Sequence, residues 1–140
     1  MIWADVALRL SAAVAIGGAI GLDRELRHKS AGVRTIGLVT LGAALAVLAV
    51  SPDLAATSRV LQGTLAGIGF LGAGVIMRHG RTIEGLTTAA SIWTAATLGA
   101  ACGLGAWQPV AVGSALVLVL LVVAGTIEKR FIRPALKDKD

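Results

Sequence analysis

The sequence is poor in cysteine, histidine and charge, and each scarcity excludes a class of protein. A single cysteine, Cys102, can form neither an internal disulfide nor a cysteine-based zinc cluster. The two histidines, His28 and His79, fall in polar loops, away from any serine or cysteine nucleophile at the right depth. Only 15% of the residues are charged, compared with about 25% in a typical soluble domain. The composition therefore offers no catalytic group, no metal-ligand cluster and little of the charge that a soluble surface needs.

The sequence is instead rich in apolar residues and glycine. The chain is 56% hydrophobic over 140 residues, with a mean hydropathy of +0.82. In water a chain of this length buries only about two-thirds of its unfolded surface, so much apolar area would stay exposed. The 18 glycines lie mostly inside apolar runs instead of loops. In a bilayer such runs must be helical, and small residues let the helices approach closely.

The apolar runs predict an all-α, polytopic membrane protein with five transmembrane helices in a glycine-rich bundle. The expected spans are residues 3–22, 35–51, 60–77, 85–104 and 109–127, which together form one domain over 1–127. A basic cytoplasmic tail is expected at 128–140. The first run also resembles a secretory signal peptide, but Asp5 stands where such a peptide carries basic residues.

The basic residues indicate how the spans are oriented. The net charge is +5, and the bases gather in the first loop, the third loop and the tail. By the positive-inside rule, five spans with the N-terminus outside place nearly all of them in the cytoplasm, whereas four spans would divide them. No nucleic-acid-binding motif or aromatic platform accompanies these bases, so nucleic acid is not an expected partner. Membrane lipid is the expected surrounding.

The glycines are expected to mark where the helices pack. The packing candidates are Gly17, Gly21, Gly63, Gly67, Gly69, Gly72 and Gly74. At about 100° per residue, Gly63, Gly67 and Gly74 share one face of the third span, and the other two glycines of that span lie well round the helix. A helix notched on two sides is expected to have neighbours on two sides. We therefore predict that the third span is the central helix of the bundle.

Polar residues collect at one end of the expected bundle. The candidate functional rim consists of Asp23, Glu25, Arg34, Arg78, Glu84, Thr87, Thr88 and Ser91. Asp23 has Arg27 four residues later, which allows an ion pair within a helix. The rim could form an ion-pair network, a regulatory docking surface or the mouth of a pathway. The hydroxyls of the fourth span, which include Thr94 and Thr97, either bond to helix backbone or line a hydrated crevice, and the first interpretation is favoured.

No enzyme constellation is present in the sequence. Residues 67–72 match the glycine pattern of a dinucleotide-binding turn, but they lie in an apolar run, and position 87, where an acidic residue would be needed, is threonine. No histidine or carboxylate lies at midspan to serve as a base or metal ligand. We therefore expect no catalytic residue, no cofactor and no metal site.

Four linked motifs resemble the MgtC/SapB membrane protein family. They are Gly21-Leu-Asp-Arg-Glu-Leu-Arg27, Ala31-Gly-Val-Arg-Thr35, the glycine-rich run at 67–78, and Gly85-Leu-Thr-Thr-Ala-Ala-Ser-Ile-Trp93. The resemblance covers roughly residues 5–127 and implies a five-helix protein of the bacterial inner membrane with the same topology. The sequence ends after the fifth span and has Thr87 where some virulence-type members carry asparagine. Both features are more similar to the short SapB-like branch.

The resemblance also implies a function. Virulence-associated members support growth at low magnesium by binding other membrane proteins, including the proton-translocating ATP synthase. For this chain we expect a non-enzymatic accessory or regulatory protein that acts by helix–helix contact with membrane partners in acclimation to low magnesium or stress. The resemblance implies ATP synthase or transporter subunits as such partners, and a homo-oligomer is also an option. The alternative is a small transporter or ion-conducting homo-oligomer, which the hydroxyls of the fourth span and the charged rim suggest.

Overall fold

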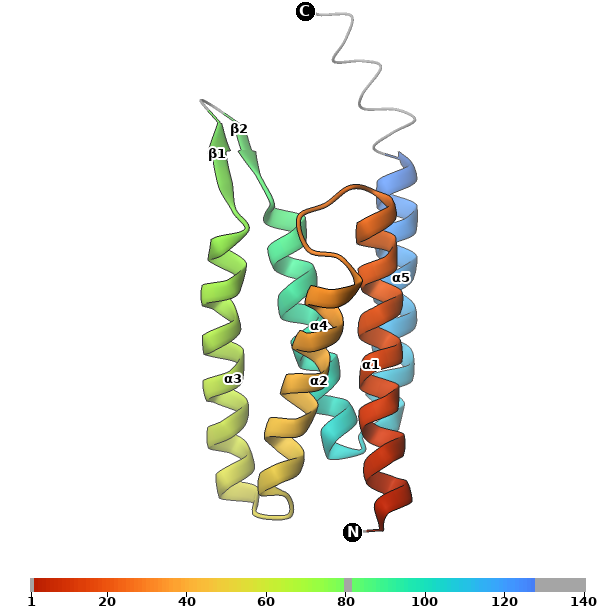
Figure 1. Ribbon diagram of the computed structural model, residues 1–140, viewed down its shortest axis with the longest axis vertical. Helices are drawn as coiled ribbons and strands as arrows, with labels where there is room; N and C mark the ends of the chain where they lie inside the picture. Colours follow the sequence, from red (N-terminus) through yellow and green to blue (C-terminus); the bar gives the residue numbers. More distant parts are fainter. Residues whose placement is uncertain (1, 80–81, 128–140) are drawn as a thin grey trace, which may run out of the picture.

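The computed structural model describes residues 2–79 and 82–127, and these form five helices and one short hairpin (Figure 1). The helices are α1 Trp3–Leu26, α2 Val33–Val50, α3 Leu54–Gly74, α4 Leu86–Leu104 and α5 Trp107–Ile127, and the strands are β1 Met77–His79 and β2 Thr82–Glu84. The predicted all-α class is confirmed. The predicted tail at 128–140 lies outside the described residues.

Three helices are long and apolar enough to cross a membrane by themselves: Trp3–Leu26, Val33–Val50 and the Trp107–Thr126 part of α5. The 21-residue α3 and the 19-residue α4 are also long enough at 1.5 Å per residue. Their polar residues and glycines lower their hydropathy. The chain is thus a helical membrane protein, and its exact number of spans stays a prediction.

Helix α3 begins six residues earlier than the expected span because Asp53 caps it. The Asp53 carboxylate accepts a hydrogen bond from the backbone N–H of Ala56 at 2.9 Å, which satisfies one of the free donors at a helix start. Arg59, expected to precede the span, therefore lies inside α3. At the other end of this helix, residues expected to form a loop pair as antiparallel strands, with Arg78 opposite Ile83.

Helix α4, and not α3, is the central helix of the bundle. It contacts α1, α2, α3 and α5, and ten of its 19 residues are buried, whereas only Thr57 and Gly72 are buried in α3. The physical reason is the pair Gly99 and Gly103. A Cβ at Gly99 would overlap the backbone of Thr40, and a Cβ at Gly103 would lie 2.5 Å from the carbonyl oxygen of Ala44. Missing side chains thus bring the backbones of α2 and α4 together.

Helices α1 and α2 also approach each other closely at glycine positions. A Cβ at Gly17 would overlap the side chain of Thr40, and one at Gly21 would lie 2.6 Å from Cα of Val33. The largest fully buried side chains of these two helices, Ile20 and Ile36, fill the space beside the glycines. Three tightly packed helices, α1, α2 and α4, therefore form the core that positions the polar end of the molecule.

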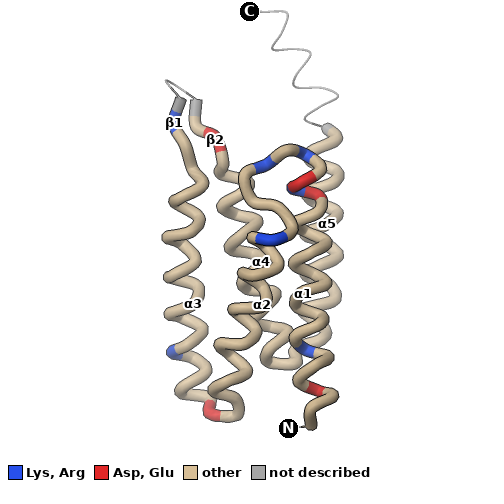
Figure 2. The backbone as a smooth tube through the Cα atoms, viewed as in Figure 1, with Lys and Arg blue, Asp and Glu red and all other residues tan. Residues whose placement is uncertain are grey.

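The helices alternate in direction, so the charged loops gather at one end (Figure 2). The α1–α2 loop, the hairpin and the end of α5 lie together at this end. The N-terminus, the α2–α3 turn and the α4–α5 turn lie at the other. We call the first the hairpin end. Among the described residues, Arg9 and Arg59 are the bases placed away from it.

Candidate functional site

Two arginines of α1 hold the two ends of α4. Arg9 pairs with Asp5 at 3.0 Å and donates from Nη1 to the carbonyl oxygen of Gly103 at 2.9 Å, at the last turn of α4. At the hairpin end, Arg24 Nη2 donates to Thr88 Oγ1 at 2.8 Å. Cations near the last carbonyls of a helix are favourable, so Arg9 is well placed. The contact of Arg24 fixes the start of α4 against the end of α1.

Arg24 is a buried cation in a membrane protein, with only 3% of its surface exposed. It falls on the packed face of α1 because positions 17, 20, 21 and 24 repeat with helical spacing. Burial of a charged group is expensive unless it is hydrogen-bonded, so a buried arginine is a candidate functional residue. The sequence prediction missed Arg24 as a site residue, although its spacing from Gly17 and Gly21 carried the signal.

Several residues of the predicted rim are brought together by the α1–α2 corner. Arg27 Nε lies 2.8 Å from Asp23 Oδ1, the ion pair expected from their spacing. Glu25 Oε2 accepts a hydrogen bond from the backbone N–H of Val33 at 3.0 Å and thereby supports the start of α2. These contacts fix the corner beside Arg24 and Thr88.

Other rim residues lie apart from this corner. Arg78 and Glu84 are exposed on the hairpin, which projects beyond the helices at this end (Figure 1). Arg34 is exposed in the first turn of α2. The predicted rim is thus divided between the α1–α2 corner and the hairpin.

Three hydroxyls of α4 bond to their own helix. Ser91 donates to the carbonyl oxygen of Thr87 at 2.7 Å, Thr94 to that of Ala90 at 2.8 Å, and Thr97 to that of Trp93 at 3.1 Å. This is the ordinary behaviour of hydroxyls in membrane helices. The row of hydroxyls that suggested a hydrated ion path is therefore explained by hydrogen bonds to the backbone of α4 itself. Within residues 2–79 and 82–127, no group of three or more His, Cys, Asp or Glu side chains could hold a metal.

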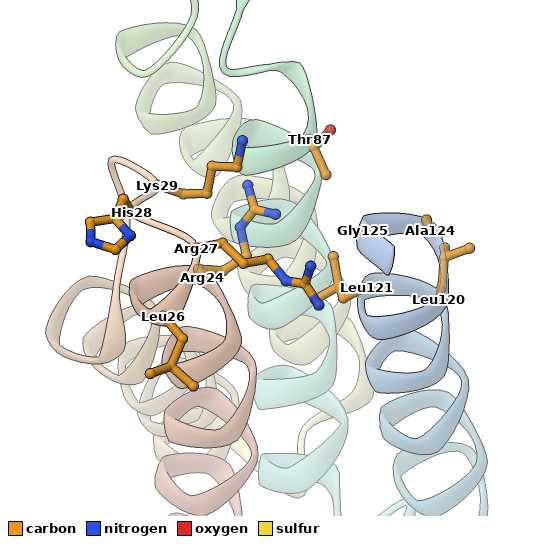
Figure 3. A pocket seen from close by; sticks show the side chains of 10 residues that line it. All are labelled: Arg24, Leu26, Arg27, His28, Lys29, Thr87, Leu120, Leu121, Ala124 and Gly125. Atoms are coloured by element: carbon orange, nitrogen blue, oxygen red, sulfur yellow. The ribbon is translucent and has the colours of Figure 1, made fainter. Parts of the chain in front are cut away.

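A cavity of about 680 Å³ lies at the hairpin end between α1, α4 and α5 (Figure 3). It is lined by Arg24, Leu26, Arg27, His28, Lys29, Thr87, Leu120, Leu121, Ala124 and Gly125. The side chains of Arg24, Arg27 and Lys29 extend into the space toward Thr87 and Leu121, whereas His28 and Leu26 point away from them. One wall is thus cationic, and the wall formed by α5 is apolar.

The third helix has one packed face and one open face. Gly72 lies on the packed face, where a Cβ would be 3.5 Å from Cβ of Ala89. On the other side, a Cβ added at Gly63, Gly67 or Gly74 would meet no atom within 4 Å, and the same is true of Gly69. The prediction that these four glycines pack against another helix of the chain is therefore wrong. The glycine pattern could not show which of the two expected sides is covered by helices of this chain.

We call the face of α3 formed by Gly63, Gly67, Phe70 and Gly74 the open glycine face. Phe70 lies at the edge of this face on the helical wheel, next to Gly63, and is 82% exposed. The exposed ring of Phe70 and the groove left by the glycines form a surface against which another helix can pack.

Comparison with known proteins places the chain in a family. The sequence profile described as the MgtC family matches residues 10–130. Protein MgtC of Salmonella typhimurium is 42% identical over 86% of this chain and 50% of its own length, and an uncharacterized protein of Synechocystis is 40% identical over 85% and 52%.

Protein SrpB of Synechococcus elongatus is 41% identical over 85% of this chain and 74% of its own length. The chain spans about half the length of the first curated relatives that it matches. No solved structure matches it significantly. The profile nevertheless covers most of the sequence, including the buried arginine, the tight glycine contacts of α1, α2 and α4, and the open glycine face. The chain is a membrane protein that belongs to the MgtC family.

Proposed function

We propose that this protein is a non-enzymatic accessory or regulatory protein of the bacterial inner membrane that acts by helix–helix contact with another membrane protein. The open glycine face of α3 is the contact surface. By family resemblance, the process served is acclimation to low magnesium or related stress. The N-terminus lies outside and the C-terminus in the cytoplasm.

The observation that carries this proposal is that three glycines on one face of α3 have no neighbour within 4 Å of the place where a Cβ would stand. In lipid no hydrophobic force drives helices together, so association depends on close packing, which small residues permit. At the core of this chain, Gly17, Gly99 and Gly103 serve that purpose. Gly63 and Gly67 repeat the four-residue spacing of Gly99 and Gly103 but meet no neighbour among the described residues, and a partner outside the chain accounts for them.

The partner class follows from the family and from the membrane setting. Family resemblance implies subunits of the proton-translocating ATP synthase or of a transporter. A partner would present a helix that covers Gly63, Gly67 and Gly74 and packs beside Phe70, which is exposed over 82% of its surface. Such a contact needs no catalytic residue on this chain.

Co-purification after mild detergent extraction tests the proposal. The native chain should recover a membrane protein in stoichiometric amount, and Gly67→Leu should lose it, because a leucine side chain would fill the groove. Gly42→Leu is the matched control, since Gly42 is exposed on α2 and a Cβ there would also meet no atom within 4 Å. Both variants should fold, because neither position contacts another helix.

Two results would refute the proposal. One is recovery of the chain with itself alone. The other is equal loss of the partner from the Gly67→Leu and Gly42→Leu variants, which would show that the added bulk disturbs the membrane generally and not one face.

A further inference from the structure

Helix α5 packs against the bundle near its start and borders a cavity further along. Near its start, Val110 is only 5% exposed, and a Cβ at Gly113 would lie 3.1 Å from Leu98. The outward side of this helix is exposed along its length, from Val112 at 61% to Leu120 at 67%. The cavity of about 680 Å³ occupies the space between the later part of α5 and helices α1 and α4.

The charge in this cavity is positive. Within the described part of the chain, the residues that line it include Arg24, Arg27, His28 and Lys29 and no carboxylate. Asp23 pairs with Arg27 at 2.8 Å from outside the lining, and the bases that line the cavity still outnumber this carboxylate. An anion is therefore the complementary ligand.

The two guanidinium groups are held in place before any ligand arrives. Arg24 is buried and bonded to Thr88, and Arg27 is bonded to Asp23. The Arg27 guanidinium also lies against the backbone of Gly125, since a Cβ there would overlap Nη1. Glycine at this position of α5 is what allows the cation to reach across the cavity. Preorganised donors of this kind are typical of phosphate recognition.

The opposite wall is apolar and continues onto the outer surface of α5. Leu120, Leu121 and Ala124 line the cavity, and the exposed side chain of Leu116 lies one turn before Leu120 along the helix. A soluble phosphate would leave this wall in contact with water. A phospholipid matches both walls, because its headgroup is anionic and its acyl chains run along the span.

We propose that this cavity binds the phosphate headgroup of an anionic phospholipid, with Arg24, Arg27 and Lys29 on the headgroup and the acyl chains along α5. Its volume falls within the range of about 300–1,000 Å³ that is usual for small-ligand sites. Basic pockets between membrane helices are suited to anionic headgroups. The site is separate from the open glycine face, so it does not depend on a protein partner.

Native mass spectrometry of the full-length, delipidated protein tests this inference, with phosphatidylglycerol, phosphatidylcholine and inorganic phosphate added in turn. We expect a one-lipid complex with phosphatidylglycerol that is at least about fivefold more abundant than with phosphatidylcholine, and no retained inorganic phosphate. Equal binding of the two lipids would overturn the proposal. Retention of inorganic phosphate as strong as that of phosphatidylglycerol would overturn the assignment to a lipid.

Two variants locate the binding. Lys29→Gln removes an exposed charge and should weaken phosphatidylglycerol binding about fivefold, and the Arg27→Gln/Lys29→Gln double variant about 25-fold. Arg34→Gln is the matched control, because Arg34 is an exposed base at the same end of the bundle but does not line the cavity. An equal loss from Arg34→Gln would show attraction to general surface charge and would contradict a defined site.

Discussion

At Gly99 the distance between α2 and α4 is set by the absence of a single methyl group. A Cβ there would overlap the backbone of Thr40, and backbone cannot move aside as a flexible side chain can. We expect Gly99→Leu to lower stability by at least about 1–3 kcal/mol, the usual range for overpacked cores. Thermal unfolding in detergent measures this effect. Gly42→Leu, at an open position, should unfold like the parent, and a similar loss in both variants would contradict the packing described.

Thr88 is the α4 hydroxyl with a partner on another helix. It accepts the hydrogen bond from buried Arg24 at 2.8 Å, whereas Thr97 donates to its own helix at 3.1 Å. Thr88→Val should therefore destabilise the protein by about 1–2 kcal/mol, and Thr97→Val by less than about 0.5 kcal/mol. Denaturant titration in mixed micelles compares the two. Equal values would mean that the contact between Arg24 and Thr88 is not important for stability.

At the scale of elements, α3 differs on its two sides. A Cβ at Gly72 would meet Ala89 at 3.5 Å, and one at Gly67 would meet nothing within 4 Å. Gly72→Leu should lower stability by about 1–3 kcal/mol, because the larger side chain must displace α4. Gly67→Leu should leave stability unchanged in the isolated chain. Loss of stability from Gly67→Leu and not from Gly72→Leu would mean that α3 is turned the other way.

The elements also show what sequence reasoning could and could not supply. The length of the apolar runs predicted five helices, with boundary errors such as the early start of α3 at Leu54, which follows the Asp53 cap. Glycine content did not identify the central helix, because a notch has the same pattern whether a neighbour fills it or not. The spacing of Gly99 and Gly103 was a usable signal that was overlooked. The hairpin at 77–84 came from two three-residue strands, too short to show alternation.

The candidate site was predictable in part for similar reasons. The Asp23–Arg27 pair follows from i,i+4 spacing, and the structure contains it at 2.8 Å. The cavity beside α5 could not be foreseen, because it depends on how far α5 separates from α1 and α4. The sequence of α5 is almost uniformly apolar, so it has no pattern that indicates how the helix is placed against its neighbours.

For the molecule as a whole, the alternation of five helices predicts which loops share a side of the membrane. Ser30 lies in the α1–α2 loop and Ser58 near the start of α3, at opposite ends of the bundle. In intact cells, a membrane-impermeant maleimide should label Ser58→Cys and not Ser30→Cys, and inverted vesicles should give the reverse. Native Cys102 should not be labelled by the maleimide, because its side chain is fully buried. Labelling of both positions from one side would contradict the predicted topology.

The chain packs around α4, and we propose that the open glycine face of α3 binds another membrane protein. Photo-crosslinking in native membranes tests it most directly, with a photoreactive residue placed at position 67 and, as control, at position 42. We expect one crosslinked product of defined mass, containing a different membrane protein, from position 67 and none from position 42. Crosslinks from position 67 to lipid alone, or only to a second copy of this chain, would contradict it.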